Sequence, residues 1–163
     1  MKTLVNIILS LILIFAFGSN IFADSDETNI YKFTLKSLQN EDVKLSDFKD
    51  KLVLINFWAT WCGPCLKEMP DLVKLKKDFI DKEFEILGIV VTSNEKNVKK
   101  IVDNYKINYP VLWGTTEIVT EFGNISSIPR TFLINQDGEI VEDILGMRDY
   151  EFFKKLADKY IKK

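Results

Sequence analysis

The 163-residue sequence contains no histidine and only two cysteines. Without histidine, the chain has no histidine-ligated zinc, copper or haem site and no Cys-His or Ser-His-Asp catalytic arrangement. Two cysteines cannot complete a Cys₄ zinc site or hold an iron–sulfur cluster within one chain. We therefore expect no metal and no cofactor apart from the cysteines themselves. Acid–base chemistry is left to carboxylates, lysines, tyrosines or the two thiols.

The chain also lacks a strong charge of one sign. Lysine and arginine number 22 and aspartate and glutamate 24, so the net charge is −2. No basic field is available to attract nucleic acid. Hydrophobic residues make up 47% of the chain and aromatic residues 12%, which is typical of a globular protein. The length fits one domain, and we expect a monomer.

Residues 1–23 have the pattern of a secretory signal. Lys2 provides the positive charge, residues 4–17 are mainly apolar, and Ala23 offers a small residue for cleavage. The alternative is an uncleaved membrane anchor, because residues 4–22 approach the length of about 20 residues that spans a bilayer. In both cases the folded part would lie in the periplasm or at the outer face of the cytoplasmic membrane. We expect a flexible lead-in at 24–30 and one domain at 31–163.

Hydrophobic patterning predicts an α/β fold. Strands are expected at 31–35, 43–45, 52–58, 84–91, 131–135 and 139–145, a short extended segment at 109–113, and helices at 63–81, 95–105, 116–122 and 149–161. The nearly continuous apolar run at 52–58 is typical of a strand buried on both faces of a sheet. This order predicts a mixed central sheet with helices on both faces and an N-terminal β-hairpin.

The two cysteines, Cys62 and Cys65, lie between the buried strand and a helix that begins at Gly63. A disulfide between them would stabilise the fold little, because its stabilising effect grows with loop length. At a helix start, the dipole and free backbone N–H groups stabilise the first thiolate, and the second thiol is near enough to resolve a mixed disulfide. Pro64 suits the first turn. The pattern indicates redox chemistry rather than a chance pair, a structural pair or half a metal site.

The run Trp61–Cys65 resembles the active site of thioredoxins. The wider pattern, Phe57 to Cys62 followed by Glu68 and Pro70, resembles the TlpA/ResA branch of exported thioredoxin-like reductases. The resemblance covers about residues 31–161. It implies a thioredoxin-like fold with an inserted helix–strand segment around 95–113.

The resemblance also implies roles for individual residues. Cys62 attacks a substrate disulfide, Cys65 resolves the mixed disulfide, and Glu68 is the acid–base group, with a pKa raised by desolvation. Thioredoxins proper carry an aspartate at the position of Asn56, and asparagine cannot take a proton. Either Glu68 replaces that aspartate, or the resolving step is slow; Asn56 is otherwise a hydrogen-bonded core residue.

Further residues are expected at the substrate-binding surface. In the resembled family the Ile128-Pro129 bond is cis, faces the cysteines and pairs its backbone with the substrate. Trp61, Gly63 and Pro64 are expected beside it, with Trp58 packed as support. Arg130 departs from the small polar residue common in the family, and it either affects substrate choice or is a solvated surface residue.

These observations predict an extracytoplasmic oxidoreductase that reduces disulfides of exported proteins. A thiol reductant in the membrane would restore its dithiol. The resemblance adds cytochrome c biogenesis, with apocytochromes c as candidate substrates. The alternatives are a disulfide oxidase or isomerase, a peroxiredoxin-like peroxidase, and a non-enzymatic client-binding module. A peroxidatic cysteine would need a threonine three positions earlier, where this chain has Ala59.

Overall fold

A computed structural model describes residues 30–161. The expected signal at 1–23 and the lead-in up to residue 29 lie outside these residues. Within residues 30–161, no helix has both the length and the apolar character needed to cross a membrane.

The central sheet has five strands in the order β5-β4-β3-β6-β7. They are β3 (Leu52–Trp58), β4 (Phe84–Val90), β5 (Val111–Trp113), β6 (Arg130–Ile134) and β7 (Ile140–Leu145). The pairs β3–β4 and β4–β5 are parallel, and β3–β6 and β6–β7 are antiparallel. The predicted mixed sheet is therefore confirmed. All seven residues of β3 are buried, as expected for a central strand covered on both faces.

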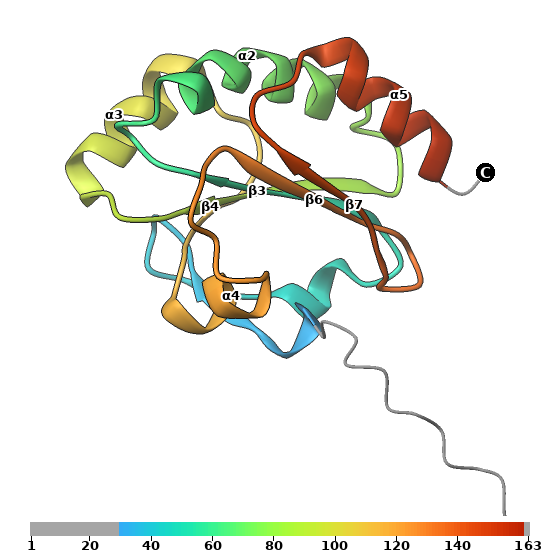
Figure 1. The fold of residues 1–163 in the computed structure, drawn as a ribbon, viewed down its shortest axis with the longest axis horizontal. Helices are drawn as coiled ribbons and strands as arrows, with labels where there is room; N and C mark the ends of the chain where they lie inside the picture. Colours follow the sequence, from blue (N-terminus) through green and yellow to red (C-terminus); the bar gives the residue numbers. More distant parts are fainter. Residues whose placement is uncertain (1–29, 162–163) are drawn as a thin grey trace, which may run out of the picture.

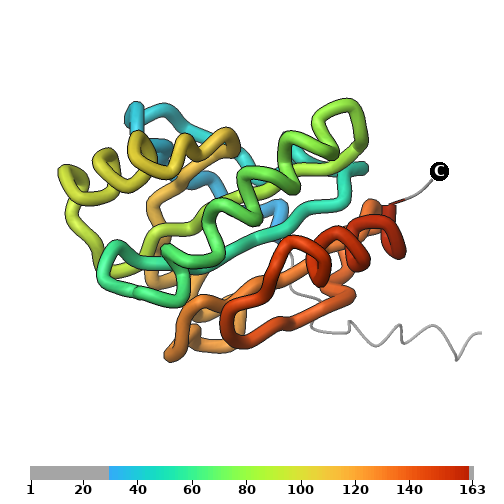
Figure 2. The backbone as a smooth tube through the Cα atoms, turned by 90° about the horizontal axis from the view of Figure 1, so that it is seen from above, coloured from blue at the N-terminus to red at the C-terminus, as the bar shows by residue number. Residues whose placement is uncertain are grey.

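Two layers cover the sheet (Figure 1). Helices α2 (Gly63–Asp78), α3 (Glu95–Tyr105) and α5 (Tyr150–Tyr160) lie on one face. The other face carries α4 (Thr116–Glu121), the 3₁₀ turns η1 (Ile30–Lys32) and η2 (Leu45–Phe48), and the predicted hairpin of β1 (Thr34–Lys36) and β2 (Asp42–Lys44). From above, α2 and α5 lie side by side, with α3 on the other side of α2 (Figure 2).

Alternation along β3 divides the core in two, because successive side chains of a strand point to opposite faces. Leu54 and Trp58 belong to the core under α2, whereas Ile55 and Phe57 belong to the core on the α4 side. Four phenylalanines are buried in these cores: Phe79, Phe122, Phe132 and Phe153.

Two predicted elements have wrong boundaries. The helix predicted at 63–81 ends at Asp78, where the chain turns back toward β4. Phe79 packs against Phe84 with ring centroids 5.3 Å apart, and Ile80, which the predicted bounds place in this helix, is 68% exposed. The strand predicted from residue 31 begins only at Thr34, because Phe33 N–H donates to the Ile30 carbonyl and closes a 3₁₀ turn before it. The other elements lie within two residues of their predicted bounds.

Candidate active site

The two cysteines lie where β3 passes into α2. Cys62 is the N-cap of α2 and has an extended backbone, while Gly63 and Pro64 form the first turn. The Cys65 backbone N–H donates to Cys62 Sγ over 3.2 Å. The two sulfur atoms form a disulfide, and the Cα atoms are 5.3 Å apart. The sequence-predicted pair is thus joined at the start of a helix.

The disulfide is shielded, with one exposed edge. Cys62 retains 4% of its surface and Cys65 retains 2%, so the small remaining access is greater at Cys62. Trp61 is 66% exposed, and Gly63 and Pro64 are also exposed. Exposed surface next to the disulfide is thus provided by Trp61, Gly63 and Pro64, and their role in binding a partner stays a prediction.

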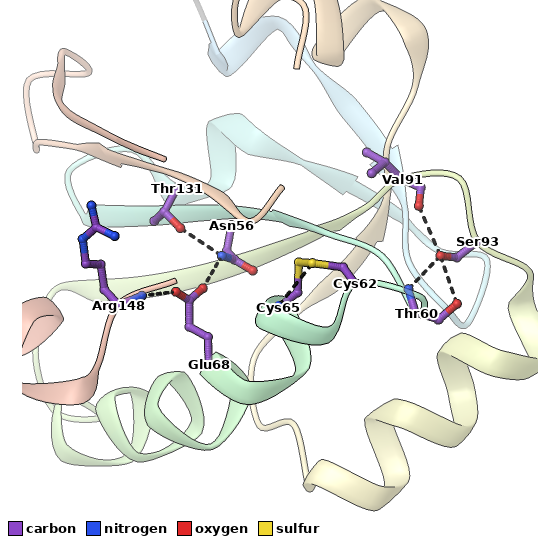
Figure 3. The surroundings of a disulfide bond; sticks show 9 residues. All are labelled: Asn56, Thr60, Cys62, Cys65, Glu68, Val91, Ser93, Thr131 and Arg148. Atoms are coloured by element: carbon purple, nitrogen blue, oxygen red, sulfur yellow. Dashed lines mark hydrogen bonds between the residues drawn. A yellow bond between two sulfur atoms is a disulfide. The ribbon is translucent and has the colours of Figure 1, made fainter. Parts of the chain in front are cut away.

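Glu68 lies one turn after Cys65 and is 1% exposed. Its Oε1 accepts a hydrogen bond from Asn56 Nδ2 over 2.9 Å, and its Oε2 accepts one from the Arg148 backbone N–H over 2.7 Å (Figure 3). Burial raises the pKa of Glu68 to about 7, although these two hydrogen bonds and the Arg148 charge act to lower the pKa. A carboxyl group with this pKa exchanges protons readily near neutral pH.

Asn56 is bound on both sides by polar groups. Its Nδ2 also donates to Thr131 Oγ1 over 2.9 Å, so both hydrogens of the amide have acceptors (Figure 3). An aspartate here would place a second carboxylate against Glu68, whereas the amide supplies a donor. Thr131 and the Arg148 backbone N–H were missed in the sequence analysis. The alternation of side chains along β6 could have predicted that Thr131 lies on the same face of the sheet as Asn56. No sequence pattern predicts a hydrogen bond from the backbone N–H of a loop residue such as Arg148.

The Ile128–Pro129 peptide bond is cis, as predicted. Pro129 is buried, and its carbonyl accepts a hydrogen bond from the Gly146 N–H over 2.9 Å. This contact joins the segment before β6 to the loop after β7. Ile128 is half-buried and packs against both cores.

Arg130 is held away from the cysteines. Because side chains alternate along β6, Thr131 points to Asn56 while Arg130 points to the opposite face with Phe132. Arg130 binds Asp143 through two hydrogen bonds of 2.8 and 2.6 Å. Of the two alternatives for this residue, the geometry favours a surface role over one in substrate choice.

The two tryptophans differ in environment. Trp58 is fully buried behind the disulfide, and its Nε1 has no hydrogen-bond partner among residues 30–161. Trp61 donates from Nε1 to the Thr92 carbonyl over 3.1 Å. Trp58 thus lies in the core and Trp61 at the surface, and their roles as support and as a substrate contact stay predictions.

The arrangement defines a thioredoxin-fold thiol–disulfide oxidoreductase: a Cys-Gly-Pro-Cys disulfide opens α2, and a cis-proline precedes β6. Comparisons place the chain more closely. Residues 27–143 match the AhpC/TSA family. The chain is 32% identical over 166 residues to the thiol-disulfide oxidoreductase ResA of Bacillus thuringiensis (strain Al Hakam), covering 99% of this chain and 94% of the relative. It is 35% identical over 133 residues to ResA of Bacillus subtilis (strain 168), covering 82% of this chain and 73% of that relative.

Solved structures agree with this assignment. A thiol:disulfide interchange protein of the thioredoxin family from Chlorobium tepidum TLS superposes with a TM-score of 0.77 at 31% identity, covering 85% of this chain and 99% of that one. StoA from Bacillus subtilis superposes with a TM-score of 0.65 at 25% identity, covering 76% and 93%. The chain belongs to the AhpC/TSA family and is a ResA-like thiol–disulfide oxidoreductase. The thioredoxin-like fold expected from the sequence is confirmed.

Proposed function

We propose that this protein reduces disulfides of exported proteins outside the cytoplasm. One observation carries the proposal: the Cys62–Cys65 disulfide opens α2, and the buried carboxyl group of Glu68 lies one turn further along the same helix. The Gly63-Pro64 pair between the cysteines resembles that of reducing thioredoxins rather than disulfide-forming enzymes. The signal-like pattern of residues 1–23 supports an exported location.

The cycle begins with the dithiol form. The Cys62 thiolate attacks one sulfur of a substrate disulfide, forming a mixed disulfide and releasing one substrate thiolate, which takes up a proton. The Cys65 thiol then passes its proton to the Glu68 carboxylate and attacks Cys62 Sγ. The Cys62–Cys65 disulfide forms, and the second substrate thiolate leaves and is protonated. The substrate has gained two electrons from the dithiol and two protons, one from the solvent and one returned by Glu68.

The Glu68 environment suits this proton transfer. A carboxyl group with a pKa of about 7 accepts a proton from Cys65 and returns it near neutral pH, which an exposed glutamate does far less well. The carboxylate is fixed from both sides by Asn56 and the Arg148 backbone N–H, one helical turn after Cys65.

The partners complete the proposal. A thiol reductant in the membrane returns the disulfide to the dithiol, and apocytochromes c are candidate substrates within the class of exported proteins. We expect the protein to act as a monomer, which sedimentation of the mature chain would test. Mass spectrometry of the mature N-terminus would distinguish cleavage after Ala23 from an uncleaved anchor.

Trapping of mixed disulfides tests the function. The Cys65→Ser variant should accumulate covalent complexes with exported proteins, because the resolving thiol is absent. These complexes should disappear on treatment with dithiothreitol, and the matched variant Cys62→Ser should form few. An empty trap with Cys65→Ser would contradict the proposal and favour a non-enzymatic binding module. Consumption of peroxide by the purified protein would instead favour the peroxidase alternative.

A further inference from the structure

Thr92 has a backbone conformation that threonine rarely adopts. Its φ is +43°, in the left-handed region, which is unfavourable for a β-branched residue. Such a conformation persists only where surrounding contacts fix it. Thr92 follows β4 and precedes α3, in a four-residue segment, 91–94, that we call the Thr92 loop.

Hydrogen bonds fix the Thr92 loop at both ends. The Val91 N–H donates to the Trp58 carbonyl over 2.9 Å, and Asn94 is the N-cap of α3, with its side chain accepting from the Asn97 N–H. Between them, Ser93 Oγ donates to the Val91 carbonyl over 3.2 Å and accepts from the Thr60 N–H over 3.0 Å (Figure 3). The loop therefore braces the chain immediately before Cys62.

The left-handed turn at Thr92 is where the loop meets Trp61. The Thr92 carbonyl accepts the Trp61 Nε1–H hydrogen bond of 3.1 Å, although the Trp61 side chain is largely exposed. An exposed tryptophan without such a bond would lose rotamer freedom on binding a partner, which weakens association. A large, fixed aromatic surface next to a reactive sulfur instead suits an apolar side chain of an extended polypeptide.

We propose that Thr92 is a positioning residue, whose carbonyl holds the Trp61 indole beside Cys62 as a fixed contact for the apolar residues flanking a substrate disulfide. This inference rests on the proposed function and deepens it, because it assigns the preferred substrate class: disulfides in extended polypeptide with apolar neighbours. The inference requires that Thr92 affect substrate binding through its hydrogen bond with the Trp61 indole N–H.

Steady-state kinetics with two substrates tests this. The substrates are insulin, a protein disulfide, and 2-hydroxyethyl disulfide, which has no apolar neighbours. Thr92→Gly accepts a positive φ but frees the loop, so it should raise the KM for insulin about three- to tenfold. The kcat of Thr92→Gly for insulin should change by less than about twofold. The increase in KM for 2-hydroxyethyl disulfide should be several times smaller than the increase for insulin. Asparagine tolerates the left-handed region, so the KM of Thr92→Asn for insulin should lie close to the wild-type value.

A double-mutant cycle separates positioning from a general loss of structure. Trp61→Phe keeps an aromatic ring but removes the N–H donor, so Thr92→Gly should raise the insulin KM little further in that background. Asn40→Gly is the matched control, because Asn40 also has a positive φ, 63°, but lies in the β1–β2 hairpin on the opposite face. It should leave both reactions unchanged.

A spectroscopic measurement makes the inference independent of activity. The Trp61 indole N–H should exchange with solvent more slowly in the wild-type protein than in Thr92→Gly, as followed by nuclear magnetic resonance. Equal exchange in the two proteins would overturn the inference, as would an equal KM increase for both substrates or an undiminished effect in the Trp61→Phe background. Failure of the wild-type protein to reduce insulin would instead count against the proposed function.

Discussion

At the residue scale, Glu68 links the chemistry to stability. Its pKa is raised from 4.5 to about 7, mainly by burial, which disfavours the charged form. The folded protein therefore binds more protons at this site than the unfolded chain between about pH 4.5 and 7. Stability contributed by this group is fully present below that window and falls as the pH rises through it, by about 3 kcal/mol.

Glu68→Gln should remove this dependence. In the oxidised protein, the free energy of unfolding of the variant relative to wild type should rise by about 2–3 kcal/mol from pH 5 to pH 8. Urea unfolding at the two pH values measures this difference. Glu83→Gln, at an exposed position, is the control and should follow the wild type. A relative stability of Glu68→Gln that stays flat with pH would show that the carboxyl group does not titrate in this range.

Asn56 is the second residue on which the site depends. Asn56→Ala leaves Glu68 Oε1 and Thr131 Oγ1 without a buried donor, which should cost about 1–3 kcal/mol of stability. It should also raise the pKa of Glu68, because the hydrogen bond from Asn56 favours the carboxylate. Urea unfolding and a carboxyl-carbon nuclear magnetic resonance titration measure the two effects. The exposed Asn104→Ala should show neither, and an unmoved Glu68 pKa in Asn56→Ala would contradict this account.

At the element scale, the sheet packs closely behind the active site. Gly88 of β4 pairs with Asn56, and a Cβ at Gly88 would lie 3.1 Å from Trp58 Nε1 and 3.2 Å from Tyr109 Cε2. Both aromatic side chains are buried and have little room to move. A glycine at this position therefore lets Trp58 and Tyr109 pack closely beside β3, the strand that leads to the cysteines.

Gly88→Ala should therefore destabilise the protein by about 1–3 kcal/mol. Gly63→Ala is the matched control for unfolding, because a Cβ there would meet nothing within 4 Å. Chemical denaturation of the two variants should give clearly different midpoints. Equal midpoints would contradict this prediction, because they would show that Trp58 and Tyr109 can move enough to accommodate a methyl group at position 88.

The same scale shows what the sequence could predict. The apolar run of β3 and the Cys-x-x-Cys pair at the helix start are local patterns, and their elements were placed correctly. The end of α2 was not, because Phe79 and Ile80 continue the helical pattern while the chain must already turn toward Phe84. Contacts between residues far apart in the sequence could not be predicted from local patterns either. The Arg148 N–H reaches Glu68 across 80 residues of sequence, and only the packing of α5 beside α2 brings them together.

At the scale of the whole molecule, the sheet separates two functions. The face under α2 and α5 carries the buried polar cluster of Glu68, Asn56 and Thr131, which lies behind the disulfide. The opposite face carries α4, the hairpin and the aromatic rings of Phe57, Phe122 and Phe132, with centroids 4.7–6.0 Å apart. One face thus holds the groups proposed for proton transfer, while the other supplies apolar packing against β3 and β6.

The central claim is that Cys62 and Cys65 form a two-electron couple that reduces disulfides. Equilibrium titration of the mature protein in dithiothreitol buffers of graded potential, followed by tryptophan fluorescence and by alkylation of free thiols, tests it most directly. The account predicts a single two-electron transition near −270 mV, the value typical of reducing thioredoxins. A transition near −120 mV would identify an oxidant instead, and the absence of any reversible transition would contradict the claim altogether.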